Sequence, residues 1–150
     1  MARFVFRLAP LLKMRERIEE QAKAALGKAI GIEEKERAVL RRLEEELQDS
    51  VADQRRARDG DIWVQGQILS MDWNARRKTE IAAQHTRILD AAAQVKEAQS
   101  LLVEARRGVQ VLEKLRDRRK EQWRLEENRK ELATLSDLAA QRWMRQQTEP

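Results

Sequence analysis

Side chains able to perform acid–base, nucleophilic or metal chemistry are few and scattered along this chain. The sole histidine is His85, and there is no cysteine. Metal and nucleophile sites are usually built from His, Cys and carboxylate groups at short, fixed spacings. The nearest approach to such spacing is the acidic stripe Glu45, Asp49 and Asp53, and carboxylates four apart on a helix ordinarily pair with Lys or Arg in solvent. We therefore expect no enzyme, no metal and no cofactor.

Basic and aromatic side chains gather instead around the middle of the sequence. They are Arg55, Arg56, Arg58, Trp63, Trp73, Arg76, Arg77 and Lys78. Trp beside Arg is common at protein–protein contacts, so this cluster is interpreted either as a docking surface for an acidic partner or as a solubilising tip. The net charge of +5, from 31 basic and 26 acidic residues, does not by itself indicate nucleic acid.

Such side chains need elements that present them, and the composition predicts long helices. Charged residues make up 38 % of the chain and aromatic residues 4 %, with two prolines and five glycines. High charge combined with abundant Ala, Leu, Glu, Lys and Arg is typical of coiled coils. Since no apolar run approaches the roughly 20 residues of a membrane-spanning helix, we expect a cytoplasmic protein.

The clearest periodic feature is a stripe of mostly apolar residues at alternating spacings of three and four. Its members are Ile81, Gln84, Ile88, Ala91, Val95, Ala98, Leu102, Ala105, Val109 and Leu112. This heptad spacing places a single seam along one helix. It predicts a helix from about residue 72 to 146 that packs against a partner helix.

An earlier helix is predicted from about residue 10 to 58, with a less regular seam. That seam reads Leu11, Ile18, Ala22, Ala25, Ala29, Ile32, Glu36, Val39 and Leu43, then shifts to Leu40, Leu43, Leu47 and Val51. The shift is a stutter, which locally unwinds a supercoil, and Glu36 is a polar seam position that helps to fix register. Gly27 and Gly31 are interpreted as small residues that let the helices approach closely.

Asp59-Gly60-Asp61 is the strongest break in the chain, so residues 59–72 are predicted to form a reversal. The predicted fold class is all-α: a single domain, residues 1–150, forming a long antiparallel two-helix coiled-coil hairpin with a longer C-terminal helix. A turn near residue 65 pairs residue i with roughly 130 − i in an antiparallel coiled coil. Residues from about Lys120 onward then extend beyond the first helix, unless residues 1–9 cover part of them.

The two ends of the sequence behave differently from the seams. Phe4, Phe6 and Leu8 alternate with polar residues as in a strand, but nothing could pair with it. We expect this segment to lead directly into the first helix, with Pro10 in the first turn. After Leu115 the seam is lost while mixed charges continue, which predicts a helix either bare in solvent or inside a socket of mixed charge.

Both ends also carry motifs of a known family. The opening is Phe4-x-Phe6-x-Leu8-x-x-Leu11-Leu12, and the closing motifs are Leu112-Glu-Lys-Leu-Arg-Asp-Arg-Arg-Lys-Glu, Glu127-Asn-Arg-Lys-Glu and Asp137-Leu-Ala-Ala-Gln-Arg142. Together with the chain length and the central turn, they resemble the family of the flagellar export protein FliJ. The related stalk subunits of virulence type III secretion systems are the nearest alternative.

The resemblance implies a non-enzymatic component of flagellar type III export. Members of the family are antiparallel coiled coils similar to the central stalk of rotary ATP synthases. Their paired ends enter the hexameric export ATPase FliI and promote ring assembly and ATPase activity. The rod also contacts the cytoplasmic domain of the export gate protein FlhA, and some members bind export chaperones. The expected protein is a monomer on its own, peripherally associated with the inner membrane at the flagellar base, with no nucleic acid or small-molecule substrate.

Carried over residue by residue, the resemblance assigns two sets of site residues. The ATPase-binding set is Phe4, Phe6, Arg118, Arg119, Trp123, Glu127, Asn128, Arg129, Asp137, Gln141 and Arg142. The export-gate-binding set is Gln84 and His85, joined by Leu40, Leu43 and Leu47. Two other hypotheses stay open: a coiled-coil scaffold or dimeric adaptor with no ATPase partner, and a nucleic-acid-binding helical arm that uses the basic tip.

Overall fold

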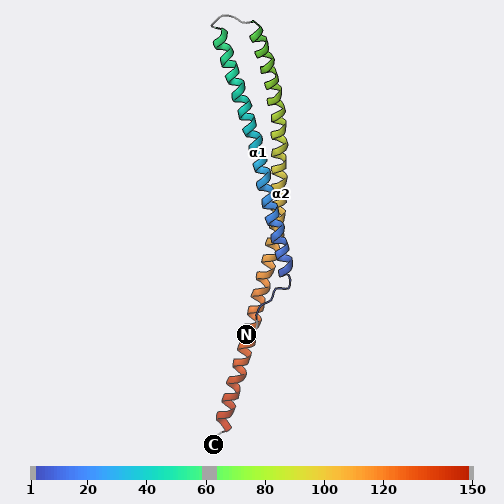
Figure 1. The fold of residues 1–150 in the computed structure, drawn as a ribbon. Helices are drawn as coiled ribbons and strands as arrows, with labels where there is room; N and C mark the ends of the chain where they lie inside the picture. The colour runs from blue at the N-terminus through green and yellow to red at the C-terminus, as the bar shows by residue number, and fades with distance from the viewer. Residues whose placement is uncertain (1–2, 59–63, 149–150) are drawn as a thin grey trace. The chain divides into compact units, whose positions relative to one another are not determined.

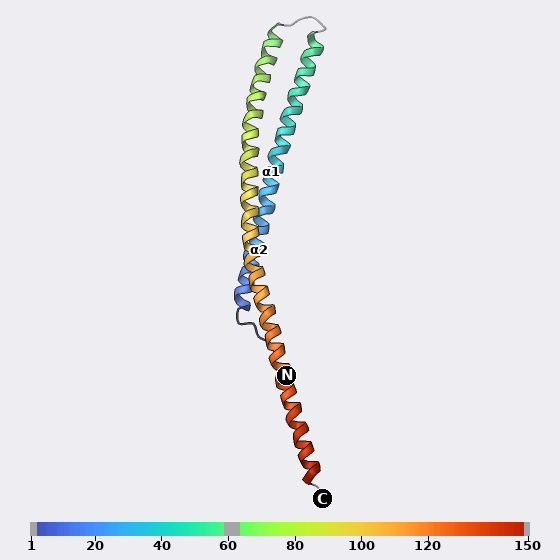
Figure 2. The ribbon, with the colours of Figure 1, turned by 180° about the vertical axis from the view of Figure 1, so that it is seen from behind.

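A computed structural model describes residues 3–58 and 64–148, and nearly all of them are helical (Figure 1). Helix α1 spans Ala9–Arg58 and helix α2 spans Val64–Thr148, with 50 and 85 residues respectively. Helices α1 and α2 run antiparallel and pack against each other, as the reverse view in Figure 2 also shows. The predicted all-α antiparallel hairpin with a longer C-terminal helix is therefore confirmed.

The second helix begins earlier than the sequence pattern indicated. We expected residues 59–72 to form the reversal, but α2 starts at Val64 and residues 64–72 are helical. Gly66, the reason for extending the reversal, sits inside the first turns, and its carbonyl oxygen accepts a hydrogen bond from Ser70 Oγ at 2.8 Å. The break at Asp59-Gly60-Asp61 lies outside the described residues.

The contacts within the chain group into two compact units, which are described separately. The first unit combines residues 1–19 with 105–150, and the second is formed by residues 20–104. Each unit contains a stretch of α1 and a stretch of α2. The single-domain organisation of residues 1–150 stays a prediction.

In the second unit, the seam predicted on α2 is the face that packs against α1. Its residues from Ile81 to Leu102 are all buried or half-buried, and Ala91, Val95 and Leu102 belong to the buried core. The alternating spacing of three and four places each of these side chains toward the partner helix. This part of the predicted packing is confirmed.

The seam predicted on α1 is wrong for part of its length. Ala25 and Ile32 are exposed, Ile32 to 47 %. One set of half-buried or buried residues keeps an unbroken spacing of three and four through the predicted stutter, and residues beside it are half-buried as well, among them Val39 and Val51 of the predicted seam. The regularly spaced set is Ala22, Leu26, Ala29, Glu33, Glu36, Leu40, Leu43, Leu47, Ser50 and Gln54. Because several of these positions are polar, the apolar pattern of the sequence indicated the neighbouring stripe that includes Ala25 and Ile32.

The helix register is also shifted from the expected one. Glu46 was expected opposite Gln84, but its carboxylate forms an ion pair with Arg77 at 3.0 Å. Ser50 likewise donates a hydrogen bond to Asn74 Oδ1 at 2.8 Å. The displacement from Gln84 to Arg77 is one heptad, and it follows from the earlier start of α2, which moves the centre of the reversal toward the N-terminus.

The small residues of α1 do not mediate the close approach that we expected. A Cβ atom added at Gly27 or at Gly31 would meet nothing within 4 Å. In the first unit, by contrast, a Cβ at Gly108 would lie 3.5 Å from Cδ of Arg15. A side chain at Gly108 would therefore make only ordinary van der Waals contact with Arg15, whereas Gly27 and Gly31 face open space.

The core of the first unit joins the N-terminal segment to both helices. Its buried residues are Phe6, Leu12, Val109 and Leu112, with Phe4, Leu8, Ala9, Leu11 and Leu115 packed around them. Residues 3–6 form no strand; a turn leads into α1, where the Leu12 N–H donates to the Leu8 carbonyl oxygen at 2.9 Å. Pro10 lies in the first helical turn, as predicted.

Candidate interaction surfaces

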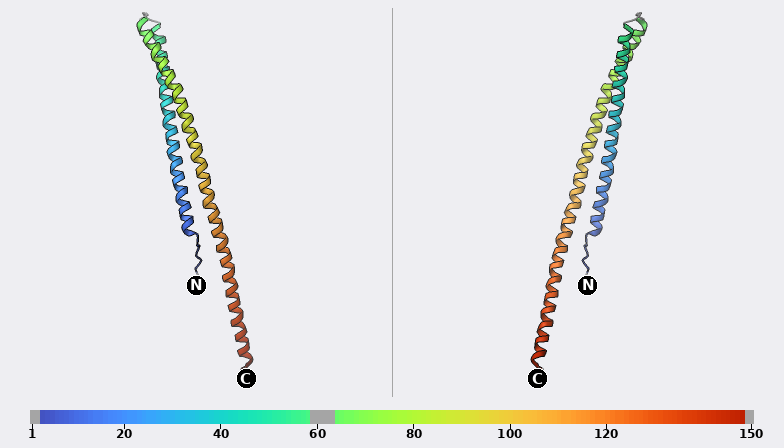
Figure 3. Two further views of the ribbon diagram at one scale, coloured as in Figure 1. Left: turned by 90° about the vertical axis from the view of Figure 1, so that its right-hand side faces the viewer. Right: turned by 90° about the vertical axis from the view of Figure 1, so that its left-hand side faces the viewer.

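In the first unit, the N-terminal segment packs on the last part of α2 before the exposed C-terminal stretch. Phe6 is 8 % exposed in the core. Phe4 is half-buried, and its ring lies 6.0 Å from the ring of Trp123 between centroids, with 51° between the ring planes. Such tilted aromatic pairs contribute about 0.5–1.5 kcal/mol beyond area burial. Residues 3–8 run beside α2 in the side views of Figure 3, and Trp123 marks the end of the seam.

Beyond Trp123, helix α2 continues as a segment in which nearly every described residue is exposed. Residues 124–147 are exposed, apart from the half-buried Glu127. At 1.5 Å per residue the stretch from 124 to the helix end measures roughly 37 Å. Its exposed large apolar residues are Leu125, Leu132, Leu135, Leu138, Trp143 and Met144. A helix with this many apolar side chains in water has unburied surface available for a partner.

The residues of the predicted ATPase-binding set occupy several faces of this helix. At 100° per residue, equivalent to 3.6 residues per turn, Arg119, Asp137 and Gln141 share one side and Arg118 and Arg129 another. All five are exposed. Charges and apolar residues all around a helix suit a partner that surrounds it better than a flat surface that touches one side.

The remaining members of that set differ in accessibility. Asn128 and Arg142 are exposed on a further side of the helix, whereas Trp123 is half-buried against Phe4. Phe6 is largely enclosed by the core. Phe4 and Phe6 are therefore placed to hold the N-terminal segment onto α2.

Glu127 makes a local ion pair on this helix. Its Oε1 accepts a hydrogen bond from Lys130 Nζ at 2.8 Å. The hydrogen bond and the charge of Glu127 raise the pKa of Lys130 above its ordinary value of 10.5. Because the lysine is fully exposed, the pair orders the helix surface and does not form a buried site.

The predicted gate-binding set lies in the second unit, and its members differ strongly in exposure. Gln84 is 3 % exposed, and its Nε2 donates hydrogen bonds to the Glu36 backbone oxygen at 2.9 Å and to the Glu36 carboxylate. Gln84 is thus engaged across the seam with α1. Its neighbour His85, expected to be packed and partly exposed, is exposed. Leu43 is buried, while Leu40 and Leu47 are half-buried.

The basic residues near the reversal lie in the same unit, but they are not equivalent. Arg77 is largely engaged: its guanidinium lies 4.7 Å from the Trp73 ring centroid and pairs with Glu46 at 3.0 Å and Glu80 at 2.6 Å. Arg55, Arg56, Arg58, Arg76 and Lys78 are exposed. Trp63, which we grouped with them, lies outside the described residues.

Sequence reasoning missed the apolar residues of the C-terminal helix as interaction candidates. The signal was present, because Leu132, Leu135 and Leu138 fall away from any continuation of the seam. It also missed the polar contacts that cross the pair at Glu36 and Ser50. Those contacts join residues far apart in sequence, so they become visible only with the register known.

The described ranges were also searched for metal-binding and membrane-spanning features. Within residues 3–58 and 64–148, no group of three or more His, Cys, Asp or Glu side chains could hold a metal ion. Over the same ranges, neither helix has a stretch sufficiently long and apolar to pass through a membrane.

The fold and these surfaces define an all-α protein built from an antiparallel helix pair, with an exposed C-terminal end of the longer helix. The chain belongs to the FliJ family: the family model described as flagellar FliJ protein matches residues 4–148. Membership makes it a component of the flagellar export apparatus and confirms the resemblance drawn from the sequence motifs. No curated protein and no solved structure shows a significant match to the chain.

Proposed function

We propose that the protein is the stalk of the flagellar export ATPase. Its N- and C-terminal ends insert into the hexameric ATPase FliI, promote assembly of the ring and raise ATP hydrolysis. The helix pair couples the ring to the cytoplasmic domain of the export gate protein FlhA. The protein works as a monomer at the cytoplasmic face of the inner membrane at the flagellar base, and it binds export chaperones there.

The observation that carries this proposal is the helix segment after Trp123. It is exposed on every side, remains helical to Thr148, and bears charged and apolar residues around its whole circumference. A ring that closes around the helix would contact all of these faces, whereas a side-by-side partner would contact one. The Phe4–Trp123 contact then determines how far along α2, in the direction of the ring, the N-terminal segment stays packed on that helix.

A truncation tests the proposal without disturbing the core. A chain that ends after Arg124 keeps Phe4, Phe6 and Trp123 in place and removes only the exposed segment. We expect the full chain to raise the ATPase activity and ring formation of FliI, as measured by phosphate release and sedimentation, and the truncated chain to have no effect. Normal stimulation by a truncated chain with unchanged helicity would overturn the assignment.

Point variants sharpen the test. Arg129→Glu combined with Arg142→Glu reverses two exposed charges on the terminal segment, and we expect stimulation to fall several-fold. The control combines Arg107→Glu with Arg76→Glu, which changes the charge equally at exposed sites outside the predicted ATPase-binding set. Arg118 is unsuitable for the control because it belongs to that set. Equal loss in both pairs would indicate a general effect of charge instead of a contact with the ring.

The gate contact is proposed on the second unit, where it includes the exposed His85 and the half-buried Leu40 and Leu47 of α1. Gln84 is bonded to Glu36, so its replacement changes stability as well as the surface. His85→Ala is the cleaner probe, with exposed Thr86→Ala as the matched control. We expect His85→Ala alone to weaken binding to the FlhA cytoplasmic domain in a calorimetric titration; equal binding by both variants would remove His85 from the contact.

A further inference from the structure

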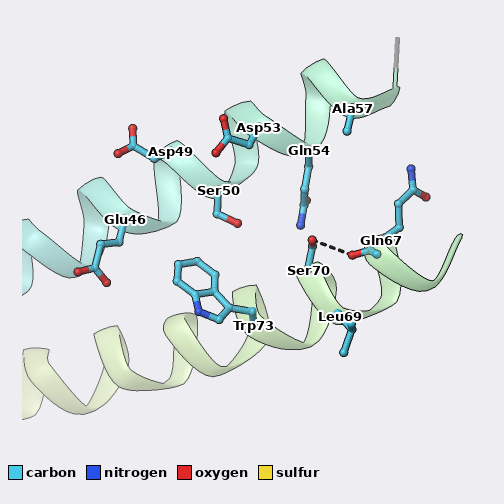
Figure 4. A pocket seen from close by; sticks show the side chains of 11 residues that line it. Glu46, Asp49, Ser50, Asp53, Gln54, Ala57, Gln67, Leu69, Ser70 and Trp73 are labelled. Carbon is cyan, nitrogen blue, oxygen red and sulfur yellow. Dashed lines mark hydrogen bonds between the residues drawn. The ribbon is translucent and has the colours of Figure 1, made fainter. Parts of the chain in front are cut away.

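A cleft opens between the last turns of α1 and the first turns of α2 in the second unit. Its volume is about 730 Å³, and Figure 4 shows the lining side chains of both helices. The residues that face each other here include Ser50, Ala57, Gly66 and Ser70, all small. Because these side chains are small, the described residues leave the helix pair unfilled at this end.

The two walls of the cleft differ in chemistry. Helix α1 contributes the carboxylates of Glu46, Asp49 and Asp53, while α2 contributes uncharged residues that include Leu69 and Trp73. Leu69 is 65 % exposed. A ligand in this cleft therefore meets negative charge on one side and apolar surface on the other.

One buried donor in the cleft has no acceptor. The Gln54 amide nitrogen is inaccessible to solvent and makes no hydrogen bond with any described residue. Its side chain projects from α1 into the gap toward α2 (Figure 4). A buried amide without a partner weakens the packing of the two helices at this end.

The carboxylates are not equally committed to partners within the chain. Glu46 pairs with Arg77 at 3.0 Å, and Asp53 makes a long, exposed contact with Arg56 at 3.8 Å. Asp49 forms no ion pair with any described residue. Asp49 and Asp53 are therefore the groups left to attract a cation.

We propose that this cleft binds a basic peptide segment of a partner protein. A Lys or Arg side chain of the segment pairs with Asp49 and Asp53, and an apolar side chain packs on Leu69 and Trp73. A peptide supplies both features within a few residues. A nucleic acid or another anionic ligand is repelled by the acidic wall.

The test uses the full chain and a fluorescein-labelled peptide of alternating Leu and Arg, with binding followed by anisotropy. The protein carries a net charge of +5, so general electrostatics oppose this probe and any binding must come from a local acidic site. We expect binding that weakens with salt, and no binding of a Leu/Glu peptide. Absence of Leu/Arg peptide binding at low salt would overturn the proposal.

Matched variants locate the site. Asp49→Asn with Asp53→Asn should weaken binding about tenfold, which corresponds to about 1.4 kcal/mol, because the exposed carboxylates form weak ion pairs. Glu44→Gln with Glu45→Gln removes the same charge from exposed positions of α1 outside the cleft and should have little effect. Equal weakening in the two pairs would overturn the assignment to the cleft.

A second pair separates the apolar contact from the charges. Leu69→Gln should weaken binding, whereas Met71→Gln, at an exposed residue outside the cleft, should not. Circular dichroism checks that each variant keeps its helicity. If sedimentation instead shows concentration-dependent dimers that Asp49→Asn with Asp53→Asn abolishes, the occupant is a second copy of the chain and the partner assignment is overturned.

Discussion

The rings of Phe4 and Trp123 meet with their centroids 6.0 Å apart, at the place where the packed part of α2 ends. Phe4 comes from the segment before α1, and Trp123 lies eleven residues after Leu112 of the buried core. This contact, together with Phe6 in the core, fastens the N-terminal segment to α2. It thereby decides where the exposed segment that we assign to the ATPase begins.

Replacing Phe6 should destabilise the first unit more than replacing Phe4. Phe6→Ala removes a buried ring from the core, and such changes cost about 3–5 kcal/mol. Phe4→Ala loses a half-buried ring and should cost less. The free energy of unfolding, measured by urea titration, checks the order, and Val5→Ala at an exposed position is the control. A smaller effect of Phe6→Ala than of Phe4→Ala would contradict the observed packing.

Charge substitutions distinguish the observed α1 seam from the apolar stripe beside it. Leu26→Lys places a charge at a half-buried seam position. It should lower the free energy of unfolding by more than roughly 1 kcal/mol, because the lysine charge loses part of its contact with water. Ile32→Lys, at an exposed position, should change stability by less than about 0.5 kcal/mol. Thermal unfolding followed by circular dichroism compares them. The reverse order would show that the stripe that includes Ile32 is the packed face of α1.

The Gln84–Glu36 contact should cost stability when broken on one side and not when both residues are replaced. Gln84→Ala leaves the Glu36 groups without their donor and should destabilise the helix pair by about 1–2 kcal/mol. Glu36→Leu combined with Gln84→Leu makes the seam apolar here and should raise the melting temperature. A double variant less stable than Gln84→Ala would show that the polar pair stabilises the fold.

The Lys130–Glu127 pair should respond to alkaline pH. The pKa of Lys130 is raised in the folded chain, mainly by the hydrogen bond from its ammonium group to Glu127. The contribution of the pair is therefore complete below the ordinary value of 10.5 and is lost as pH rises through the raised pKa. Titration by NMR should show a lower Lys130 pKa in Glu127→Gln, and no change in Glu131→Gln.

The sequence alone was sufficient for the fold class, the α2 seam and the exposed end of the longer helix. The seam from Ile81 to Leu112 is apolar at nearly every position, so its period identifies the buried face directly. The loss of that seam after Leu115 predicted a helix without a partner in the chain, and the exposure after Trp123 agrees. The terminal motifs indicated the family that the family model then matched.

The tertiary structure decided the register, the α1 seam and the role of the N-terminal phenylalanines. A slip of one heptad leaves every seam residue facing its partner, so periodicity cannot distinguish a pairing of Glu46 with Gln84 from the observed pairing with Arg77. Polar seam residues such as Glu36 and Ser50 are recognised as buried only when their partners are in place. Periodicity reports which face of a helix is apolar, whereas contacts between distant segments depend on where the chain turns.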